Sequence, residues 1–186
     1  AQPLYYLLTT CFPKSISDNW LAEFASGLAE DQHAFGISLI GGDTVYNPER
    51  IVLSLTAIGN AAKPIRRDGA NTGDDIYVTG TIGDSFLGLQ SLRGEITYND
   101  YLINRYHLPQ PRVDMITTLR QCATAAADVS DGLMADLGNI CKASKVDAEI
   151  YAENIPLSAE AIPYSDNFER LITWGDDYEI VFTCLL

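Results

Sequence analysis

The chain has 186 residues, 47% hydrophobic and 20% charged, so it can bury a sizeable core as one large domain or two small ones. Its formal net charge of -13, from 12 basic and 25 acidic residues, argues against a nucleic-acid surface, which needs clustered Lys and Arg. No apolar run approaches the roughly 20 residues that span a bilayer, and four scattered cysteines fit neither a zinc site nor a disulfide framework. We therefore expect a cytoplasmic protein with no membrane partner.

The first part of the chain predicts a helix followed by a strand. Either Ser17 or Asp18 can cap a helix that runs to about His33, because apolar residues recur there at i, i+3 and i+4 spacing. A short buried strand over residues 37–40 is then expected to end in a glycine-containing turn at 41–44. For the apolar stretch before the helix we predict neither a helix nor a strand.

A second strand over 51–58 precedes small residues and Pro at 59–64, which predict a domain boundary. We place one domain at 1–59 and the other at 60–186. In the second domain, the expected strands cover 76–79, 125–129, 148–151 and 178–183, and the expected helices contain 86–89, cover 101–107 and 113–123, and begin at 133. Alternating strands and helices predict an α/β (α+β layered) fold.

Three turns place carboxylates and glycine beside apolar strands, at residues 41–44, 128–132 and 175–177. Glycine lets a ligand approach the backbone closely, and Asp offers the hard oxygen that Mg²⁺ prefers. Turns are also rich in Gly and Asp for conformational reasons, so each turn alone is a weak signal. Their recurrence favours one metal site built from several segments.

Residues 128–132 carry the most specific signal. An apolar approach, two carboxylates and a helical pattern from Leu133 predict a strand, a tight turn and a helix. Free N–H groups at the helix start can meet an anion, and Asp128 and Asp131 can hold a cation against it. Arg66 and Arg67 are the basic exception in an acidic chain; they can neutralise phosphate oxygens or simply lie in a solvated loop.

The chain contains no Walker-type phosphate loop, no kinase glycine-rich loop with its lysine and no G-x-S-x-G elbow. If the chain binds nucleotide phosphates, it must bind them through metal ions held by aspartates. We assign no residue as nucleophile or general acid or base, since neither histidine has a supporting group nearby.

Several motifs, in order and over nearly the whole chain, resemble the thiamine-monophosphate kinase family. They are the run 39–44, the stretch 67–80, Gly83-Asp84, the region 105–112 with Pro109-Gln110-Pro111, the turn 128–132, and Gly175-Asp176-Asp177-Tyr178-Glu179. The resemblance implies the aminoimidazole ribonucleotide synthetase-like two-domain architecture, with part of an N-terminal dimerisation and ATP-binding domain and most of a C-terminal α/β domain. It also implies an enzyme that phosphorylates thiamine monophosphate to thiamine diphosphate with ATP and several Mg²⁺ ions, as a homodimer.

The same resemblance implies roles for individual residues. Gly42 with Asp43, Arg67 and Ser130 correspond to ATP contacts, and Asp43, Asp128 and Asp131 to metal ligands. Asp176 corresponds to a substrate-contacting acid that is commonly Glu in the family. Further metal-binding aspartates are expected before Ala1, and an aromatic substrate contact after Leu186.

Two other functions remain open on the sequence. One is another ATP-dependent member of the same superfamily, which would share the Asp and Gly motifs and use a different acceptor. The other is a noncatalytic module that binds divalent cations for structure or assembly. Since the acceptor phosphate is mostly ionised near neutral pH, we expect direct in-line transfer without a general base.

Overall fold

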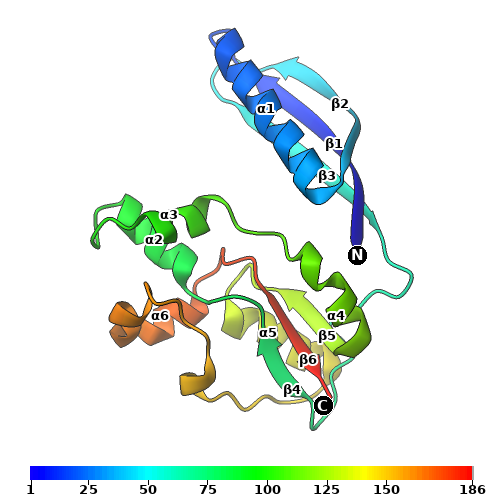
Figure 1. The fold of residues 1–186 in the computed structure, drawn as a ribbon, viewed down its shortest axis with the longest axis vertical. Helices are drawn as coiled ribbons and strands as arrows, with labels where there is room; N and C mark the ends of the chain where they lie inside the picture. The colour runs from blue at the N-terminus through cyan, green and yellow to red at the C-terminus, as the bar shows by residue number, and fades with distance from the viewer. Residues whose placement is uncertain (186) are drawn as a thin grey trace. The chain divides into compact units, whose positions relative to one another are not determined.

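The computed structural model describes residues 1–185 and contains two compact units, Ala1–Pro64 and Ile65–Leu186 (Figure 1). Each unit has a three-stranded sheet and helices, so the predicted α+β layered fold class is confirmed. No helix within residues 1–185 is both long and apolar enough to cross a membrane.

Unit 1 consists of β1 (Gln2–Phe12), α1 (Asp18–Phe35), β2 (Ser38–Tyr46) and β3 (Val52–Asn60). The sheet order is β2-β1-β3; β1 is parallel to β2, which requires the crossover helix α1, and antiparallel to β3. The hydroxyl of Ser17 accepts a hydrogen bond from the Trp20 amide, which confirms Ser17 as the N-cap of α1.

The predicted turn at 41–44 is wrong, because β2 continues through these residues. Tyr6 lies opposite Leu39 and Leu7 opposite Gly41, so β2 carries one extra residue and forms a bulge. The prediction failed because it did not include β1, a long strand in a stretch for which the sequence analysis predicted no element. Because β2 pairs with β1, Gly41 and Gly42 lie within the sheet.

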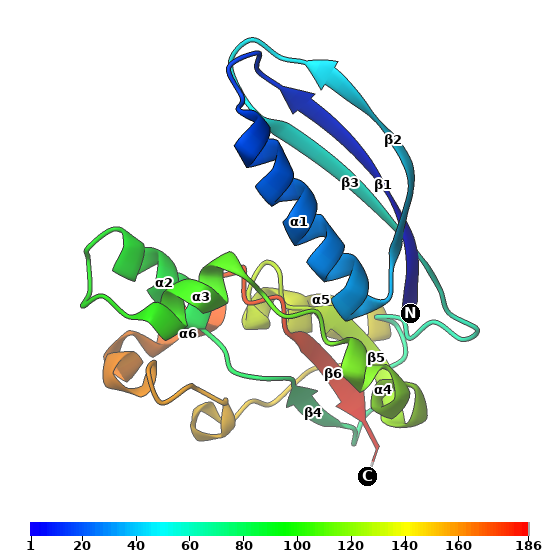
Figure 2. The ribbon, with the colours of Figure 1, turned by 45° about the horizontal axis from the view of Figure 1, so that its top comes forward.

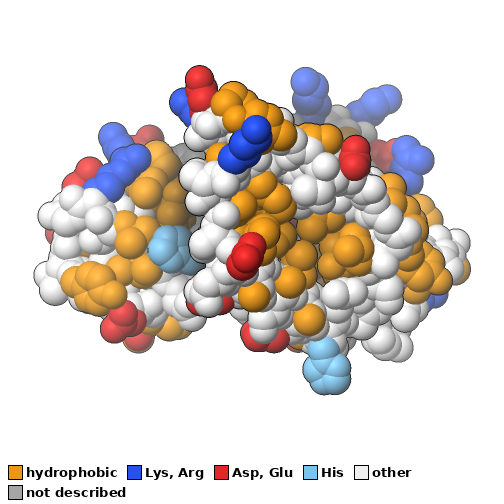
Figure 3. Space-filling view, turned by 90° about the horizontal axis from the view of Figure 1, so that it is seen from above, with side chains coloured by type: hydrophobic (Ala, Val, Ile, Leu, Met, Phe, Trp, Pro, Cys, Tyr) orange, Lys and Arg blue, Asp and Glu red, His pale blue; other side chains and the backbone are white. Residues whose placement is uncertain are grey.

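The sheet of unit 1 exposes much apolar surface. The buried residues of its strands, Tyr6, Leu8 and Thr10, all lie on β1. Exposed large hydrophobic residues on β2 and β3 are Leu39, Ile40, Val45, Tyr46, Val52, Leu53, Leu55 and Ile58. Large hydrophobic areas also show between charged side chains on the face drawn in Figure 3. Apolar surface of this extent is typical of a face that contacts another protein surface.

Unit 2 has the sheet order β4-β6-β5, in which the central strand β6 (Ile180–Cys184) is antiparallel to β4 (Asp75–Val78) and to β5 (Ala123–Asp128). Its α-helices are α2 (Asp84–Leu92), α3 (Asp100–His107), α4 (Ile116–Cys122), α5 (Leu133–Ser144) and α6 (Phe168–Thr173). Short 3₁₀ helices are η1 (Val113–Met115), η2 (Ala152–Asn154) and η3 (Ile162–Asn167). The helix predicted over 113–123 is thus divided into η1 and α4, and Ala123 begins β5.

Both faces of this sheet are covered. On one face, Leu137 and Ile140 of α5 pack in one core cluster with Val181 of β6. On the other, Leu119 of α4 packs with Phe182, the next residue along β6. Neighbouring residues of a strand point to opposite faces, so an uninterrupted apolar run suits a strand between two helical layers. A third cluster unites α2, α3 and α6, which lie together in Figure 2.

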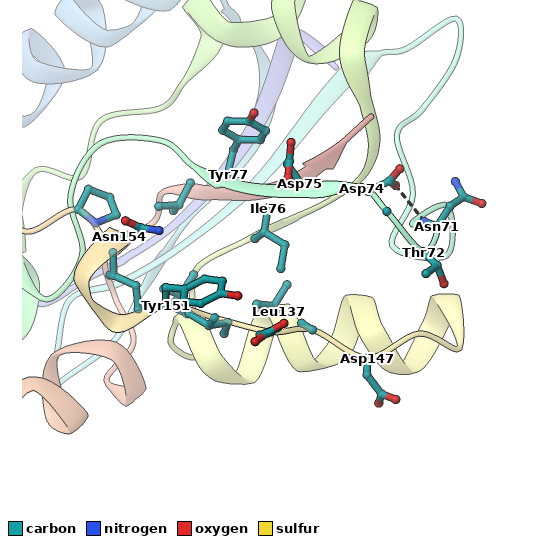
Figure 4. A pocket seen from close by; sticks show the side chains of 18 residues that line it. Asn71, Thr72, Asp74, Asp75, Ile76, Tyr77, Leu137, Asp147, Tyr151 and Asn154 are labelled. Atoms are coloured by element: carbon teal, nitrogen blue, oxygen red, sulfur yellow. Dashed lines mark hydrogen bonds between the residues drawn. The ribbon is translucent and has the colours of Figure 1, made fainter. Parts of the chain in front are cut away.

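The strand predicted over 148–151 is also wrong. These residues have no regular structure, and η2 follows them. A cavity of about 980 Å³ is lined by residues that include Ile76 and Tyr77 of β4 and Ile150 and Tyr151. Figure 4 shows Ile76 pointing from β4 toward the side on which Leu137 and Tyr151 lie. The apolar residues of this segment therefore line a cavity, and the segment does not join the sheet.

Gly42 tests the close contact between β1 and β2. Its φ is 151°, and a Cβ there would lie 1.8 Å from the Leu8 carbonyl oxygen, which is backbone and has little freedom to move. We expect Gly42→Ala to lower the thermal unfolding midpoint of unit 1 by several degrees, as a loss of roughly 1–3 kcal/mol would.

Gly27→Ala is the matched control. Nothing lies within 4 Å of a Cβ at Gly27, which is inside α1, so alanine should raise stability by roughly 0.5–1 kcal/mol. Calorimetry on both variants measures the difference. Equal midpoints would contradict the described contact of Gly42 with β1.

Candidate functional site

Two loops of unit 2 run side by side, one after β5 and one before β6. The Asp176 amide donates to the Ser130 carbonyl at 3.0 Å, and the Tyr178 amide donates to the Val129 carbonyl at 2.9 Å. A Cβ on Gly175 would lie 2.1 Å from the Ser130 carbonyl oxygen, so only glycine permits this approach. Two of the three predicted acidic turns, 128–132 and 175–177, are therefore in direct contact.

Arg67 lies at the same place. Its guanidinium pairs with the Asp128 carboxylate at 3.3 Å, and the two side chains are 50% and 57% exposed. Such half-exposed pairs contribute little to stability, so an incoming phosphate or cation can replace either partner. The Ser144 hydroxyl donates to the Arg67 carbonyl at 2.8 Å and fixes the backbone of the loop. Arg66 instead pairs with Asp68 through two hydrogen bonds of 2.9 and 2.7 Å.

The turn after β5 contains two amides that precede the first residue of α5, Leu133. The amides of Ser130 and Asp131 are not free, because both donate to the Asp136 carboxylate, at 3.0 and 2.9 Å. Asp136 is buried in the first turn of α5, where a carboxylate is stabilised by the helix dipole. An anion at this turn would therefore meet side chains and bound cations, and these two amides would not contact it.

The loop before β6 alternates exposed and buried residues. Asp176 and Tyr178 have positive φ values of 67° and 51°, which non-glycine residues seldom adopt. Asp177, which lies between these two residues, is 2% exposed, and Glu179, which follows Tyr178, is 1% exposed. Sequence reasoning gave no role to either buried acid. The residue types of Asp176 to Glu179 gave no signal for burial, because acids stand at both accessible and buried positions.

Both buried acids are well satisfied. Asp177 accepts from the amides of Gly83, at 2.8 Å, and Ser85, at 3.2 Å, where α2 begins. Glu179 forms ion pairs with Arg105, at 2.7 Å, and with Arg112, and it accepts a 2.6 Å hydrogen bond from the hydroxyl of Thr79.

Burial raises the pKa of Asp177 to about 6, because desolvation outweighs the hydrogen bonds from Gly83 and Ser85. Burial also raises the pKa of Tyr178, and the negative charges of Asp176, Asp128 and Asp131 add to that shift. Acidic side chains therefore lie near the Tyr178 hydroxyl, and Asp176 accepts its hydrogen bond at 3.3 Å.

Gly42 and Asp43 belong to unit 1. Asp43 is exposed on β2, and its carboxylate accepts from the Thr44 amide at 2.8 Å. The other predicted site residues lie in the two contacting loops and the Arg67 loop of unit 2: Arg67, Asp128, Ser130, Asp131 and Asp176. Within residues 1–185, no group of three or more His, Cys, Asp or Glu side chains is placed to hold a metal ion.

Both units match known protein families. Residues 1–61 match the N-terminal domain of AIR synthase related protein, and residues 71–184 match its C-terminal domain. Together the two matches cover most of the chain.

Curated relatives and solved structures agree with this match. Thiamine-monophosphate kinase of Caulobacter vibrioides is 42% identical over 97% of this chain and 54% of its own length. The thiamine-monophosphate kinase of Stenotrophomonas maltophilia has a TM-score of 0.89 and 37% identity, covering 99% of this chain and 62% of that chain. AaThiL complexed with AMPPCP and TMP has a TM-score of 0.89 and 30% identity, covering 98% of this chain and 62% of that chain. The chain thus spans little more than half the length of these relatives, and the resemblance seen in the sequence is confirmed.

Asp177 gives a pH-dependent prediction. Its pKa rises from the ordinary 3.8 to about 6 on folding, so the folded state holds the proton more tightly than the unfolded state. The contribution of this group to stability should therefore fall by about 3 kcal/mol as pH rises from about 4 to about 7. Carbon NMR of the Asp177 carboxyl should show a titration midpoint near 6.

The variant Asp177→Asn removes the titration. The difference in unfolding free energy between wild type and this variant should then change with pH over the same range. A difference that stays constant, together with a carboxyl midpoint near 4, would contradict the described burial.

Proposed function

Because the chain belongs to the AIR synthase related protein family, we propose that the complete protein is a thiamine-phosphate kinase, a phosphotransferase whose acceptor is a phosphate group. It phosphorylates thiamine monophosphate to thiamine diphosphate with ATP. The names of the relatives support this choice, and so does the AaThiL complex with AMPPCP, an analogue of ATP, and TMP.

One observation carries the proposal. The loops 128–131 and 175–178 bring Asp128, Asp131 and Asp176 together with the guanidinium of Arg67. A phosphoryl transfer between two polyanions needs carboxylates that hold cations and a positively charged side chain that neutralises phosphate oxygens.

In the proposed site of unit 2, Asp128 and Asp131 would hold Mg²⁺. The family resemblance also implies a metal-binding role for Asp43, which belongs to unit 1. Both carboxylates of unit 2 are exposed and offer the hard oxygen atoms that Mg²⁺ prefers, so the residues present fit the ion. When bound, Mg²⁺ neutralises phosphate oxygens and aligns the two phosphates. Two acids are too few to enclose an ion, and Mg²⁺ commonly completes its shell with water and substrate phosphates.

The remaining residues contact the two substrates. In unit 2, Arg67 and Ser130 contact the phosphates of ATP, and Asp176 contacts thiamine monophosphate. For Gly42 of unit 1, the family resemblance implies an ATP contact as well. Asp176 is one methylene shorter than the Glu that the family commonly has, and its left-handed backbone and its amide contact with Ser130 fix its place in the loop.

The reaction then needs no base from the protein. An ionised oxygen of the acceptor phosphate attacks the γ-phosphorus of ATP, a new P–O bond forms, the bond to the β-phosphate oxygen breaks, and ADP leaves. The protein contributes the alignment of the two phosphates and the compensation of their charge.

We propose that the complete protein acts in the cytoplasm as a homodimer. The exposed apolar residues on β2 and β3 of unit 1 support a contact between copies at this sheet.

The test of the reaction is a mutation in the complete protein. Asp128→Asn removes the charge that holds Mg²⁺ and keeps the size of the side chain, so thiamine diphosphate formation should fall roughly 100-fold or more. Chromatography of the products measures it, and circular dichroism should show an unchanged fold. Asp166→Asn, an exposed acid of η3, is the control and should keep full activity.

A wild-type protein that consumes ATP with another acceptor, and none with thiamine monophosphate, would instead favour a different member of the superfamily. Trapping a phosphorylated enzyme would exclude direct in-line transfer.

Nucleotide binding separates an enzyme from a cation-binding module. In calorimetry with AMPPCP, binding should be strong with Mg²⁺ and should weaken at least tenfold when EDTA removes it, since the carboxylates then repel the phosphates. Binding of Mg²⁺ without any binding of the nucleotide would support the noncatalytic module.

A further inference from the structure

Tyr178 is an unusual residue in this site. Its φ of 51° is left-handed, a conformation that is strained for a bulky side chain, and the residue is 47% exposed. Strain of this kind persists only where the surrounding structure imposes it, and it concentrates at functional positions. The roles proposed above for the site residues do not include this ring.

The surrounding structure holds Tyr178 from both sides. Before it, the carboxylate of Asp177 is bound to two amides at the start of α2. After it, the carboxylate of Glu179 is bound to Arg105 and Arg112. Both acids are fully buried, so neither can leave its partners without losing compensation for its charge. The exposed ring is therefore presented by two rigid anchors.

The ring is held beside the negative part of the site. The Tyr178 amide donates to the carbonyl of Val129, which lies between Asp128 and Asp131 in the chain, at 2.9 Å. The Tyr178 hydroxyl donates to the Asp176 carboxylate at 3.3 Å. Burial raises the pKa of Tyr178 most, and the charges of these three acids raise it further. An aromatic face with carboxylates around it attracts a flat cation and gives a neutral ring no such advantage.

We propose that Tyr178 determines substrate specificity by placing its ring against the cationic thiazolium ring of thiamine monophosphate. This inference rests on the proposed function and adds a residue to its substrate site. The adenine of ATP is the rival occupant. Adenine is uncharged, so the surrounding carboxylates favour the thiazolium.

The experiment compares three variants of the complete protein. Tyr178→Leu removes the aromatic face and keeps a non-glycine residue at the strained position, so the KM for thiamine monophosphate should rise about tenfold while the KM for ATP stays unchanged. Tyr178→Phe keeps the face and should change the KM for thiamine monophosphate less than about threefold, since the ring supplies most of a cation–π contact. Tyr98→Leu is the matched control, because Tyr98 is also exposed and also donates to an acid two residues away, Asp100, at 2.9 Å. It should change neither KM.

If the wild type makes thiamine diphosphate, any of three results would overturn the inference. They are an unchanged KM for thiamine monophosphate in Tyr178→Leu, a rise only in the KM for ATP, or a rise in the KM for thiamine monophosphate that is as large in Tyr178→Phe as in Tyr178→Leu. Calorimetry with thiamine monophosphate separates this from a failure of the proposed function. A wild type that binds the compound without phosphorylating it refutes the kinase, and weaker binding by Tyr178→Leu then still supports the ring contact. A wild type that neither binds nor phosphorylates it refutes both.

Discussion

The arrangement of unit 2 depends on compensating one buried carboxylate. Glu179 lies at the start of the central strand β6, 1% exposed, and it pairs with Arg105 of α3 and with Arg112 of the following loop. Removing one partner of a buried pair typically costs roughly 3–5 kcal/mol, because the remaining charge is left without compensation. Arg105 also lies 3.5 Å from the buried Asp84 of α2. The helical layer is therefore tied to the sheet through charge, and the loop before β6 cannot shift independently of either.

This constraint explains how a few consecutive residues serve both structure and chemistry. In the loop before β6, the buried Asp177 and Glu179 hold the backbone, and Asp176 and Tyr178 between them stay accessible to ligands. A similar division follows β5, where the buried Asp136 binds the amides of the turn and the carboxylates of Asp128 and Asp131 remain exposed. A buried acid whose oxygens are already bound to amides or arginines is not available to a metal ion. The exposed acids are the ones left for it.

The sequence predicted local features well and long-range ones poorly. The cap at Ser17 and the strand, turn and helix around residues 128–133 depend on neighbouring residues, and the structure contains them. The errors at 41–44 and 148–151 depend on distant segments: β1 keeps the first in a sheet, and the second borders a cavity. For the site, residue type indicated the exposed aspartates. It could not separate them from the buried ones, because burial is decided by packing of segments far apart in the chain.

Charge balance also indicates how a ligand enters the proposed site. Without ligand, Arg67 neutralises part of the charge of Asp128 through a half-exposed pair of 3.3 Å. In the proposed function, a nucleotide that arrives with Mg²⁺ would bring a partner of opposite charge for each: the phosphate for the guanidinium and the cation for the carboxylate. The hydrogen bonds of Asp177 and the ion pairs of Glu179 hold the loop before β6. Arg67 and Asp128 are half-exposed side chains, so they can exchange partners without a shift of that loop.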